Sequence, residues 1–176
     1  MDWTDLLKAG IEENYHAAEG LINAVDDSKL DWKPSTGQNW MTMGQLLMHL
    51  TGACGSCCKG FVTGDWGFPE GVDPGSIPSD QMLPSADKLP AVKSVAEAKK
   101  LLAEDKKLAL EMLAKAGEKD LDGRMVKAPW DQTSAQLGCQ LLSMIGHLTL
   151  HKSQLFYYLK LQGKPVNTMS LFGMWG

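Results

Sequence analysis

The sequence predicts an all-α protein, a four-helix bundle with a long Pro- and Gly-rich loop between the second and third helices. Three observations predict this class. Apolar residues recur at helical spacing in four segments, capping sequences mark the ends of these segments, and prolines and glycines are concentrated between the second and third segments. The 176 residues suit one domain, 1–176, and a hydrophobic content of 44% is enough to build its core.

The first predicted helix covers residues 3–25. Its apolar stripe consists of Leu7, Ile11, Tyr15, Ala18, Ile22 and Val25. The second predicted helix covers residues 42–62 and opens with the capping-box sequence T-x-x-Q. Gly52 and Gly55 weaken its intrinsic helix propensity, so we expect packing to hold this helix together.

The long loop covers residues 63–93, where the prolines and glycines exclude a long regular element. A loop of this length is more typical of a lid or pocket wall than of a bare connector.

The third helix is expected at 94–116, from an S-x-x-E capping box to Gly117 as the residue after its end. A short extended piece is expected at 124–126. The fourth helix is expected at 133–163, from a T-x-x-Q sequence to Gly163, with Pro165 just beyond.

The charge balance limits the classes of partner. The chain has 17 Lys and Arg against 21 Asp and Glu, a formal net charge of −4, which disfavours a nucleic-acid binder. No apolar run approaches the ~18 residues of a membrane span, and the first residues lack the pattern of a signal peptide. We therefore expect a cytoplasmic protein that acts on a small-molecule substrate, with no nucleic-acid and no membrane partner.

The four cysteines are expected to be reduced. Cys54, Cys57 and Cys58 lie within five positions of one helix, a spacing that does not suit long-loop disulfides, and Cys139 is distant from them in sequence. We interpret the three as small apolar residues packed in a helix, with metal or redox use as the alternative.

Three histidines form a candidate metal site. His147 and His151 are four residues apart, so they lie on one helix face one turn apart, at a spacing that suits a shared metal. His49 in the second helix is the third candidate ligand, and three ligands leave a coordination position open. The alternative is that the pair borders an apolar face and His49 is a hydrogen-bonded core residue. His16 lies off the apolar stripe of its helix and is expected on the outer face.

Asp105 stands out among the carboxylates because it falls inside the apolar stripe of the third helix. That stripe consists of Ala98, Leu101, Leu102, Leu108, Ala109, Met112 and Leu113. A buried carboxylate needs a partner. Asp105 is therefore either a hydrogen-bond acceptor for a metal-binding imidazole, or a base in a ligand pocket, or a structural residue paired with a lysine or a backbone donor. The sequence points to no other catalytic residue.

These residues and their order resemble the DinB/YfiT-like superfamily of metal-binding four-helix bundles. The resemblance lies in M-H-L around His49 and in the late sequence H-x-x-x-H-x-x-Q…G-x-P, which begins at His147 and ends at Pro165. It spans most of the chain. The resemblance implies that His49, His147 and His151 bind a divalent metal ion, for which we expect Zn²⁺ or Ni²⁺, with Fe²⁺ or Mn²⁺ as alternatives.

Members of that superfamily with an assigned activity are metal-dependent transferases or isomerases that use low-molecular-weight thiols. The resemblance therefore implies a metal-dependent thiol S-transferase. The alternatives are a metal-dependent hydrolase, in which metal-bound water is the nucleophile, and a non-catalytic metal- or ligand-binding bundle.

A second apolar stripe on the fourth helix predicts a further contact. Leu142, Ile145 and Phe156 lie on the side away from the predicted core, and an exposed stripe of this kind usually finds a partner. We expect either a homodimer through this face or its cover by the C-terminal residues 171–175.

Overall fold

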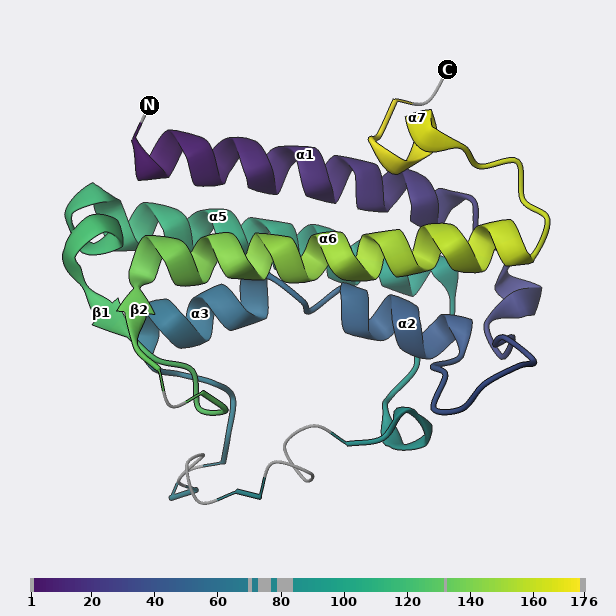
Figure 1. Ribbon diagram of the computed structural model, residues 1–176, viewed down its shortest axis with the longest axis horizontal. Helices are drawn as coiled ribbons and strands as arrows, with labels where there is room; N and C mark the ends of the chain where they lie inside the picture. Colours follow the sequence, from purple (N-terminus) through teal and green to yellow (C-terminus); the bar gives the residue numbers. More distant parts are fainter. Residues whose placement is uncertain (1, 70, 73–76, 79–83, 132, 175–176) are drawn as a thin grey trace.

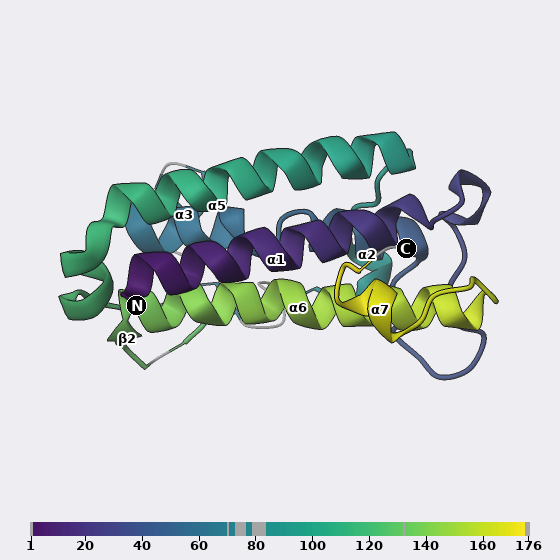
Figure 2. The same ribbon diagram turned by 90° about the horizontal axis from the view of Figure 1, so that it is seen from above.

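The computed structural model describes residues 2–69, 71–72, 77–78, 84–131 and 133–174. Three long helices lie side by side along the long axis (Figures 1 and 2): α1 (Trp3–Asn23), α5 (Val95–Gly123) and α6 (Leu137–Leu161). The fourth side of the bundle consists of two short helices that follow one another, α2 (Met43–Leu50) and α3 (Gly55–Thr63). The protein is thus a helical bundle, as predicted. Shorter elements complete it: the 3₁₀ turns Asp27–Lys29 and Ala86–Lys88, strands β1 (Met125–Val126) and β2 (Ala135–Gln136), and helix α7 (Thr168–Leu171).

The predicted helix 42–62 is broken in the middle, so that prediction was wrong in its continuity. Cys54, which precedes α3, has φ −123° and ψ −64°, outside helical geometry. A Cβ atom on Gly55 would lie 2.1 Å from the backbone oxygen of Asp105, so only glycine allows α5 to approach this closely. The break therefore follows from the packing of α3 against α5, and the two glycines mark where it occurs.

The beginning of α1 is stabilised by polar contacts from its own first turn and from α5. The Asp2 side chain caps the first turn by accepting from the Asp5 N–H (2.9 Å). Across the bundle, α5 leaves helical geometry at Gly117 (φ 68°), where the sequence predicted its end, and then resumes as far as Gly123. This extension was not predicted. It brings the Glu118 carboxylate to the backbone N–H groups of Trp3 and Thr4, where it stabilises the positive end of α1.

The beginning of the fourth helix differs from the prediction. Helix α6 begins at Leu137 rather than at residue 133, because Ala135 and Gln136 pair as β2, antiparallel to β1. The expected extended piece at 124–126 corresponds to β1. The predicted stop is confirmed, since α6 ends just before Gly163, which has φ 75°.

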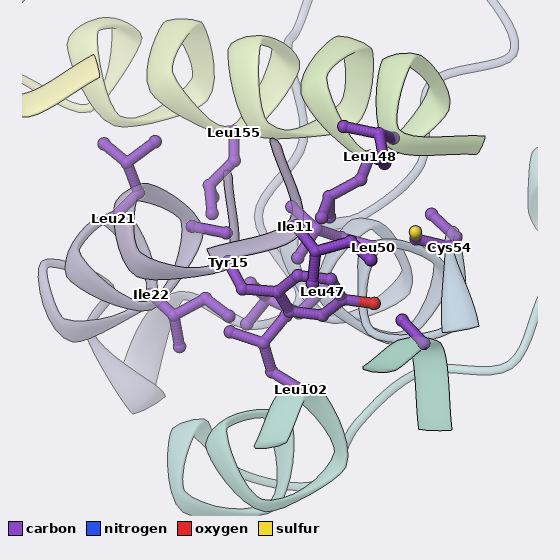
Figure 3. Close-up of a cluster of buried hydrophobic side chains, with 14 of the residues drawn as sticks. Ile11, Tyr15, Leu21, Ile22, Leu47, Leu50, Cys54, Leu102, Leu148 and Leu155 are labelled. Atoms are coloured by element: carbon purple, nitrogen blue, oxygen red, sulfur yellow. The ribbon is translucent and has the colours of Figure 1, made fainter. Parts of the chain in front are cut away.

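The predicted apolar stripes form the core between the four sides of the bundle. Leu7, Ile11, Tyr15 and Ile22 are all at most 2% exposed. Figure 3 shows Tyr15 surrounded by aliphatic side chains of the neighbouring helices, with its hydroxyl directed toward the region of Cys54. Filling of this kind accounts for most of the stability of such a bundle, because each large side chain that is buried contributes about 1.5–3 kcal/mol.

The second stripe on α6 is largely covered within the chain itself, so its predicted exposure was wrong. Ile145 and Phe156 are each 5% exposed, and only Leu142, at 43%, remains outside. Ile145 packs against α1, where it lies 3.4 Å from the position of a Cβ on Gly10. Helix α7 packs on α1 and α6, whereas residue 175 lies outside the described residues. Homodimerisation stays a prediction, without the exposed stripe that motivated it.

Among the described residues, no helix combines the length and the apolar character needed to cross a membrane.

Candidate metal centre

Three imidazoles meet where α2 faces the middle of α6. His49 lies in the last turn of α2, and His147 and His151 lie one turn apart on α6. One ligand nitrogen from each ring lies within 4.8 Å of the other two. The ring centroids are 4.3 Å apart for His49 and His151, and 4.7 Å apart for His147 and His151. The structure thus brings together the three histidines that the sequence singled out.

Hydrogen bonds determine which nitrogen of two of these rings carries the proton. His147 Nδ1 lies 2.9 Å from the carbonyl oxygen of Ala53, and His151 Nδ1 lies 3.1 Å from the side-chain oxygen of Gln154. The Ala53 carbonyl can only accept, so His147 Nδ1 carries the proton in the neutral ring. With the Gln154 amide oxygen toward His151, the same holds for His151 Nδ1. Each Nε2 is then left with a lone pair, which is the form that binds a metal.

The two Nε2 atoms face each other at a distance of 2.9 Å. With both Nδ1 atoms protonated, neither neutral ring offers an Nε2–H to the other. Two lone pairs at this separation repel unless an electrophile, a proton or a metal ion, neutralises them. The arrangement of donors therefore fits a divalent cation, which His147, His151 and His49 would hold together.

The surroundings of His49 and His151 favour the neutral form of these two imidazoles. Burial, followed by the neighbouring His151 and His147, lowers the pKa of His49 to about 4. Burial also lowers the pKa of His151, and the hydrogen bond with Gln154 partly opposes this shift. Neutral imidazole is the metal-binding form, so these shifts favour binding without competition from protons.

The cluster opens onto a large cavity between α3, α6 and the loop before β2. This cavity measures about 900 Å³, and its described lining consists of His49, Cys57, Trp130, Ser143, Met144, Gly146, His147, Thr149 and Leu150. A second cavity of about 250 Å³ shares His49, His147 and Cys57 and reaches Leu89 and Pro90 near the end of the long loop. Three protein ligands with cavities beside them are typical of a catalytic metal site, which keeps a position for water or substrate.

Asp105 has structural partners. Its Oδ2 accepts hydrogen bonds from the Tyr15 hydroxyl (2.6 Å) and the Gly55 N–H (2.9 Å). Its Oδ1 accepts from the N–H (2.8 Å) and the hydroxyl (3.1 Å) of Ser56. The carboxylate therefore caps the N-terminus of α3 from another helix. Among the described residues its hydrogen bonds do not include an imidazole, so the geometry favours the backbone-donor alternative over a direct role at the histidines.

The cysteines are free thiols, and they differ in their surroundings. Cys54 and Cys58 are buried with their sulfur atoms 3.9 Å apart, as expected for packed apolar residues. Cys57 instead lines both cavities, and burial, followed by Asp105 and Cys54, raises its pKa to about 12. The Cys57 side chain therefore stays a thiol at neutral pH. Cys139 is exposed.

Gln154 is the Q of the H-x-x-x-H-x-x-Q sequence that carried the family resemblance, and it lies on the same helix face as His151. Sequence reasoning missed two other contributors to this region. The Ala53 carbonyl was not detectable, since it is free to accept only because the helix is broken after α2. Trp130 lies in a loop, where no apolar periodicity could have pointed to it.

His16 is exposed on α1, as predicted, with Nε2 3.1 Å from the Gly173 oxygen.

A helical bundle with three histidines gathered from two facing helices defines a class of candidate metal-binding proteins. The family description of the DinB superfamily matches residues 11–155, a segment that contains His49, Asp105, His147 and His151. The chain belongs to the DinB superfamily. Searches of curated proteins and of solved structures found no significant match.

Proposed function

We propose that the protein is a metal-dependent thiol S-transferase that binds one divalent ion through His49, His147 and His151. The observation that carries the proposal is the pair of Nε2 atoms facing each other at 2.9 Å while both Nδ1 atoms lie on acceptors. The large cavity beside the cluster supplies space for two small reactants. The thiol-transfer chemistry rests on membership of the DinB superfamily.

The chain contributes orientation and access. The Ala53 carbonyl and the Gln154 amide hold the two α6 imidazoles with their lone pairs directed into the site. The raised pKa of Cys57 disfavours it as the nucleophile, so the reacting thiol comes from a separate small molecule. A bound divalent cation supplies Lewis acidity, which lowers the pKa of a coordinated thiol or water.

The transfer reaction is a substitution at an electrophilic carbon. The thiol loses its proton to solvent, a sulfur lone pair forms the new S–C bond, and the leaving group departs with the electrons of the bond that breaks. Holding thiol and electrophile in one cavity makes this a reaction between neighbours, which reduces its entropic cost.

The first test is metal content. Protein purified without a His-tag, then loaded with Co²⁺ and desalted, should hold about one equivalent of metal per chain, and His147→Ala should lose it. His16→Ala is the matched control, because this exposed histidine lies outside the cluster and should retain the metal. Equal metal content in the wild type and in all three single alanine variants of the cluster would falsify the metal site.

The second test addresses the thiol. Adding 2-mercaptoethanol to the Co²⁺-loaded protein should produce a sulfur-to-cobalt charge-transfer band, and the His147→Ala protein should show none. A metal-loaded protein without this band contradicts thiol transfer. Release of acid from activated esters by the same sample would then indicate the hydrolase.

A further inference from the structure

The cavity beside the histidines has one wall that is apolar and aromatic. Trp130, Met144 and Leu150 contribute to its lining, together with His49 and His147 of the cluster. Leu150 is 70% exposed and Trp130 is 46% exposed, so both side chains are accessible to a ligand from solution. The described lining residues include no Lys, Arg, Asp or Glu. This wall therefore offers dispersion and ring stacking, and no charged partner.

Trp130 is exposed but held in place by neighbouring aromatic rings. Its ring lies edge-on to Trp66 with centroids 5.1 Å apart, and Trp66 in turn lies 4.8 Å from Phe61 of α3. Trp66 also fits closely over Gly60, where an added Cβ would lie 2.3 Å from the indole. A rigid, exposed indole loses little conformational entropy when a ligand stacks on it.

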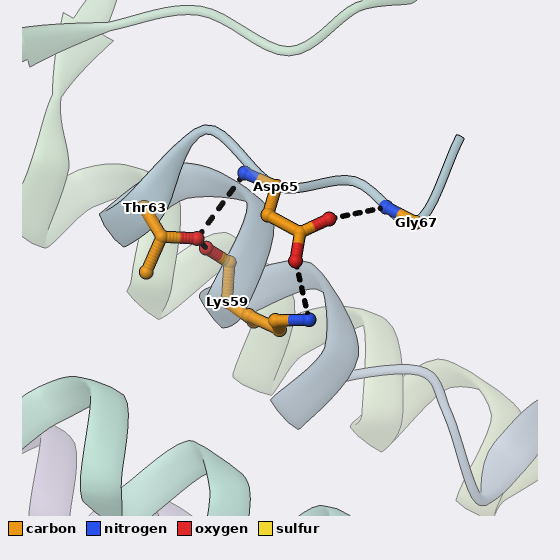
Figure 4. Close-up of polar contacts among 4 residues, drawn as sticks. All are labelled: Lys59, Thr63, Asp65 and Gly67. Atoms are coloured by element: carbon orange, nitrogen blue, oxygen red, sulfur yellow. Dashed lines mark hydrogen bonds and ion pairs between the residues drawn. The ribbon is translucent and has the colours of Figure 1, made fainter. Parts of the chain in front are cut away.

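The turn that precedes Trp66 is itself fixed by polar contacts, which Figure 4 shows. Asp65 forms an ion pair with Lys59 (2.6 Å) and accepts from the Gly67 N–H (2.9 Å). The Asp65 N–H donates to the Thr63 hydroxyl (3.1 Å). These contacts join both sides of Trp66 to the end of α3, so the aromatic wall belongs to the bundle rather than to the middle of the long loop.

The α6 side of the cavity leaves room for a ligand. Gly146 lines the cavity one residue before His147, and a Cβ built on it meets no atom within 4 Å. The glycine lies in regular helix, where its backbone conformation is accessible to any residue. A larger side chain at this position would extend into the cavity without backbone strain.

We propose that this cavity binds the electrophilic substrate through an uncharged aromatic group that stacks on Trp130 and contacts Met144 and Leu150. The proposal rests on the proposed function in taking this ligand to be the electrophile. The cavity volume of about 900 Å³ suits a molecule of a few rings. In the metal-free protein the described lining offers neither an anionic nor a cationic ring a charged side chain as partner.

The test uses metal-free protein and the neutral fluorescent probe N-phenyl-1-naphthylamine. Gly146→Leu should fill the cavity and weaken binding about 10-fold or more, and Trp130→Ala should weaken it roughly 5- to 10-fold through loss of stacking. Leu142→Ala, which removes an exposed apolar side chain of α6 outside the lining, is the matched control and should bind the probe like the wild type.

Charge selectivity is measured by competition. Benzyl alcohol should displace the probe at concentrations at least about 10-fold lower than benzoate, which has a ring of the same size and a negative charge. Equal competition by the two compounds would overturn the preference for an uncharged ring. Probe binding that is the same in Gly146→Leu, Trp130→Ala and the wild type would overturn the assignment of the cavity.

The two proposals fail in different ways. If the Co²⁺ protein shows no thiol band but probe binding depends on Gly146 and Trp130, the aromatic pocket stands and thiol transfer is wrong. If the thiol band forms but the variants bind the probe normally, thiol transfer stands and the aromatic pocket is wrong. Circular dichroism of each variant confirms that the fold is retained.

Discussion

Two polar clusters lie on either side of the break between α2 and α3, and their hydrogen bonding differs. On the side of α5, the Asp105 carboxylate accepts four hydrogen bonds, from Tyr15, Gly55 and Ser56. On the side of α6, two imidazole Nε2 atoms face each other with a lone pair each. The first cluster needs nothing more from solution. The second is the cluster that we propose to hold a divalent cation.

The difference separates a structural role from a ligand-binding role in the interior of one bundle. A buried charge with all its hydrogen bonds made stabilises the arrangement of the elements that supply the donors. Imidazole nitrogens that converge beside a cavity suit a ligand-binding role, because the lone pair of a neutral imidazole can bind a cation. The Asp105 cluster also supports the histidines indirectly, since it fixes the start of α3, two residues after the carbonyl of Ala53 that orients His147.

The largest effect on stability is expected at Asp105. Asp105→Asn replaces one acceptor oxygen by an NH₂ group that faces N–H or O–H donors. We therefore expect the free energy of unfolding to fall by about 3 kcal/mol. Urea denaturation measures this change. Tyr15→Phe, which removes one of the four hydrogen bonds, should cost about 1.5 kcal/mol.

Asp105→Asn should change Zn²⁺ affinity much less than it changes stability. At a temperature where it is folded, Asp105→Asn should bind Zn²⁺ within about 3-fold of the wild type, because its contacts are with α1 and α3 and not with the imidazoles. A large loss of Zn²⁺ affinity in the folded variant, with little change in stability, would instead return Asp105 to the metal centre.

Metal addition should stabilise the protein through the second cluster only. At a free Zn²⁺ concentration 100 times the dissociation constant, the free energy of unfolding should rise by about 2.7 kcal/mol. The melting temperature, measured by calorimetry, should rise by roughly 5–11 °C for a chain of this size. His147→Ala should show no such rise, whereas His16→Ala should behave like the wild type. A similar rise in His147→Ala would mean that Zn²⁺ binds elsewhere.

Gln154 tests the orientation of His151. Gln154→Ala removes the acceptor at Nδ1, so Zn²⁺ affinity in a competition titration should fall about 10–100-fold, with stability nearly unchanged. Gln154→Glu keeps an acceptor oxygen at this position and should restore most of the affinity. If alanine and glutamate lower the affinity equally, the amide does not act through hydrogen bonding to His151.

The smallest effect is expected in the acid range of the metal-free protein. Folding lowers the pKa of His49 from 6.5 to about 4, so between these values the unfolded chain binds a proton that the folded chain does not. The stability that depends on neutral His49 is therefore present above about pH 6.5 and is lost as the pH falls toward 4. Denaturation at pH 7 and pH 5 measures this slope. His49→Phe should reduce the difference in the free energy of unfolding between pH 7 and pH 5. An unchanged difference would contradict the assignment of this pH dependence to His49.

Much of the fold could be predicted because apolar periodicity and capping are local. The stripe from Leu7 to Ile22 and the turn at Gly117 follow from side chains within a few residues of one another. The spacing of His147 and His151 also guarantees a shared helix face. Their approach to His49 required two helices to pack, which the apolar stripes and the family resemblance together indicated.

What the sequence by itself determined was therefore the set of amphipathic segments and the residues that share a face. Only the tertiary structure decided where polar groups found their partners. The break at residues 51–54 exists because α5 approaches Gly55 closely and Asp105 takes up the N–H groups that begin α3. The carbonyl that orients His147 and the position of Trp130 in the cavity follow from that packing. The partner of a buried polar group is chosen by whichever distant segment reaches it, and local periodicity carries no information about that choice.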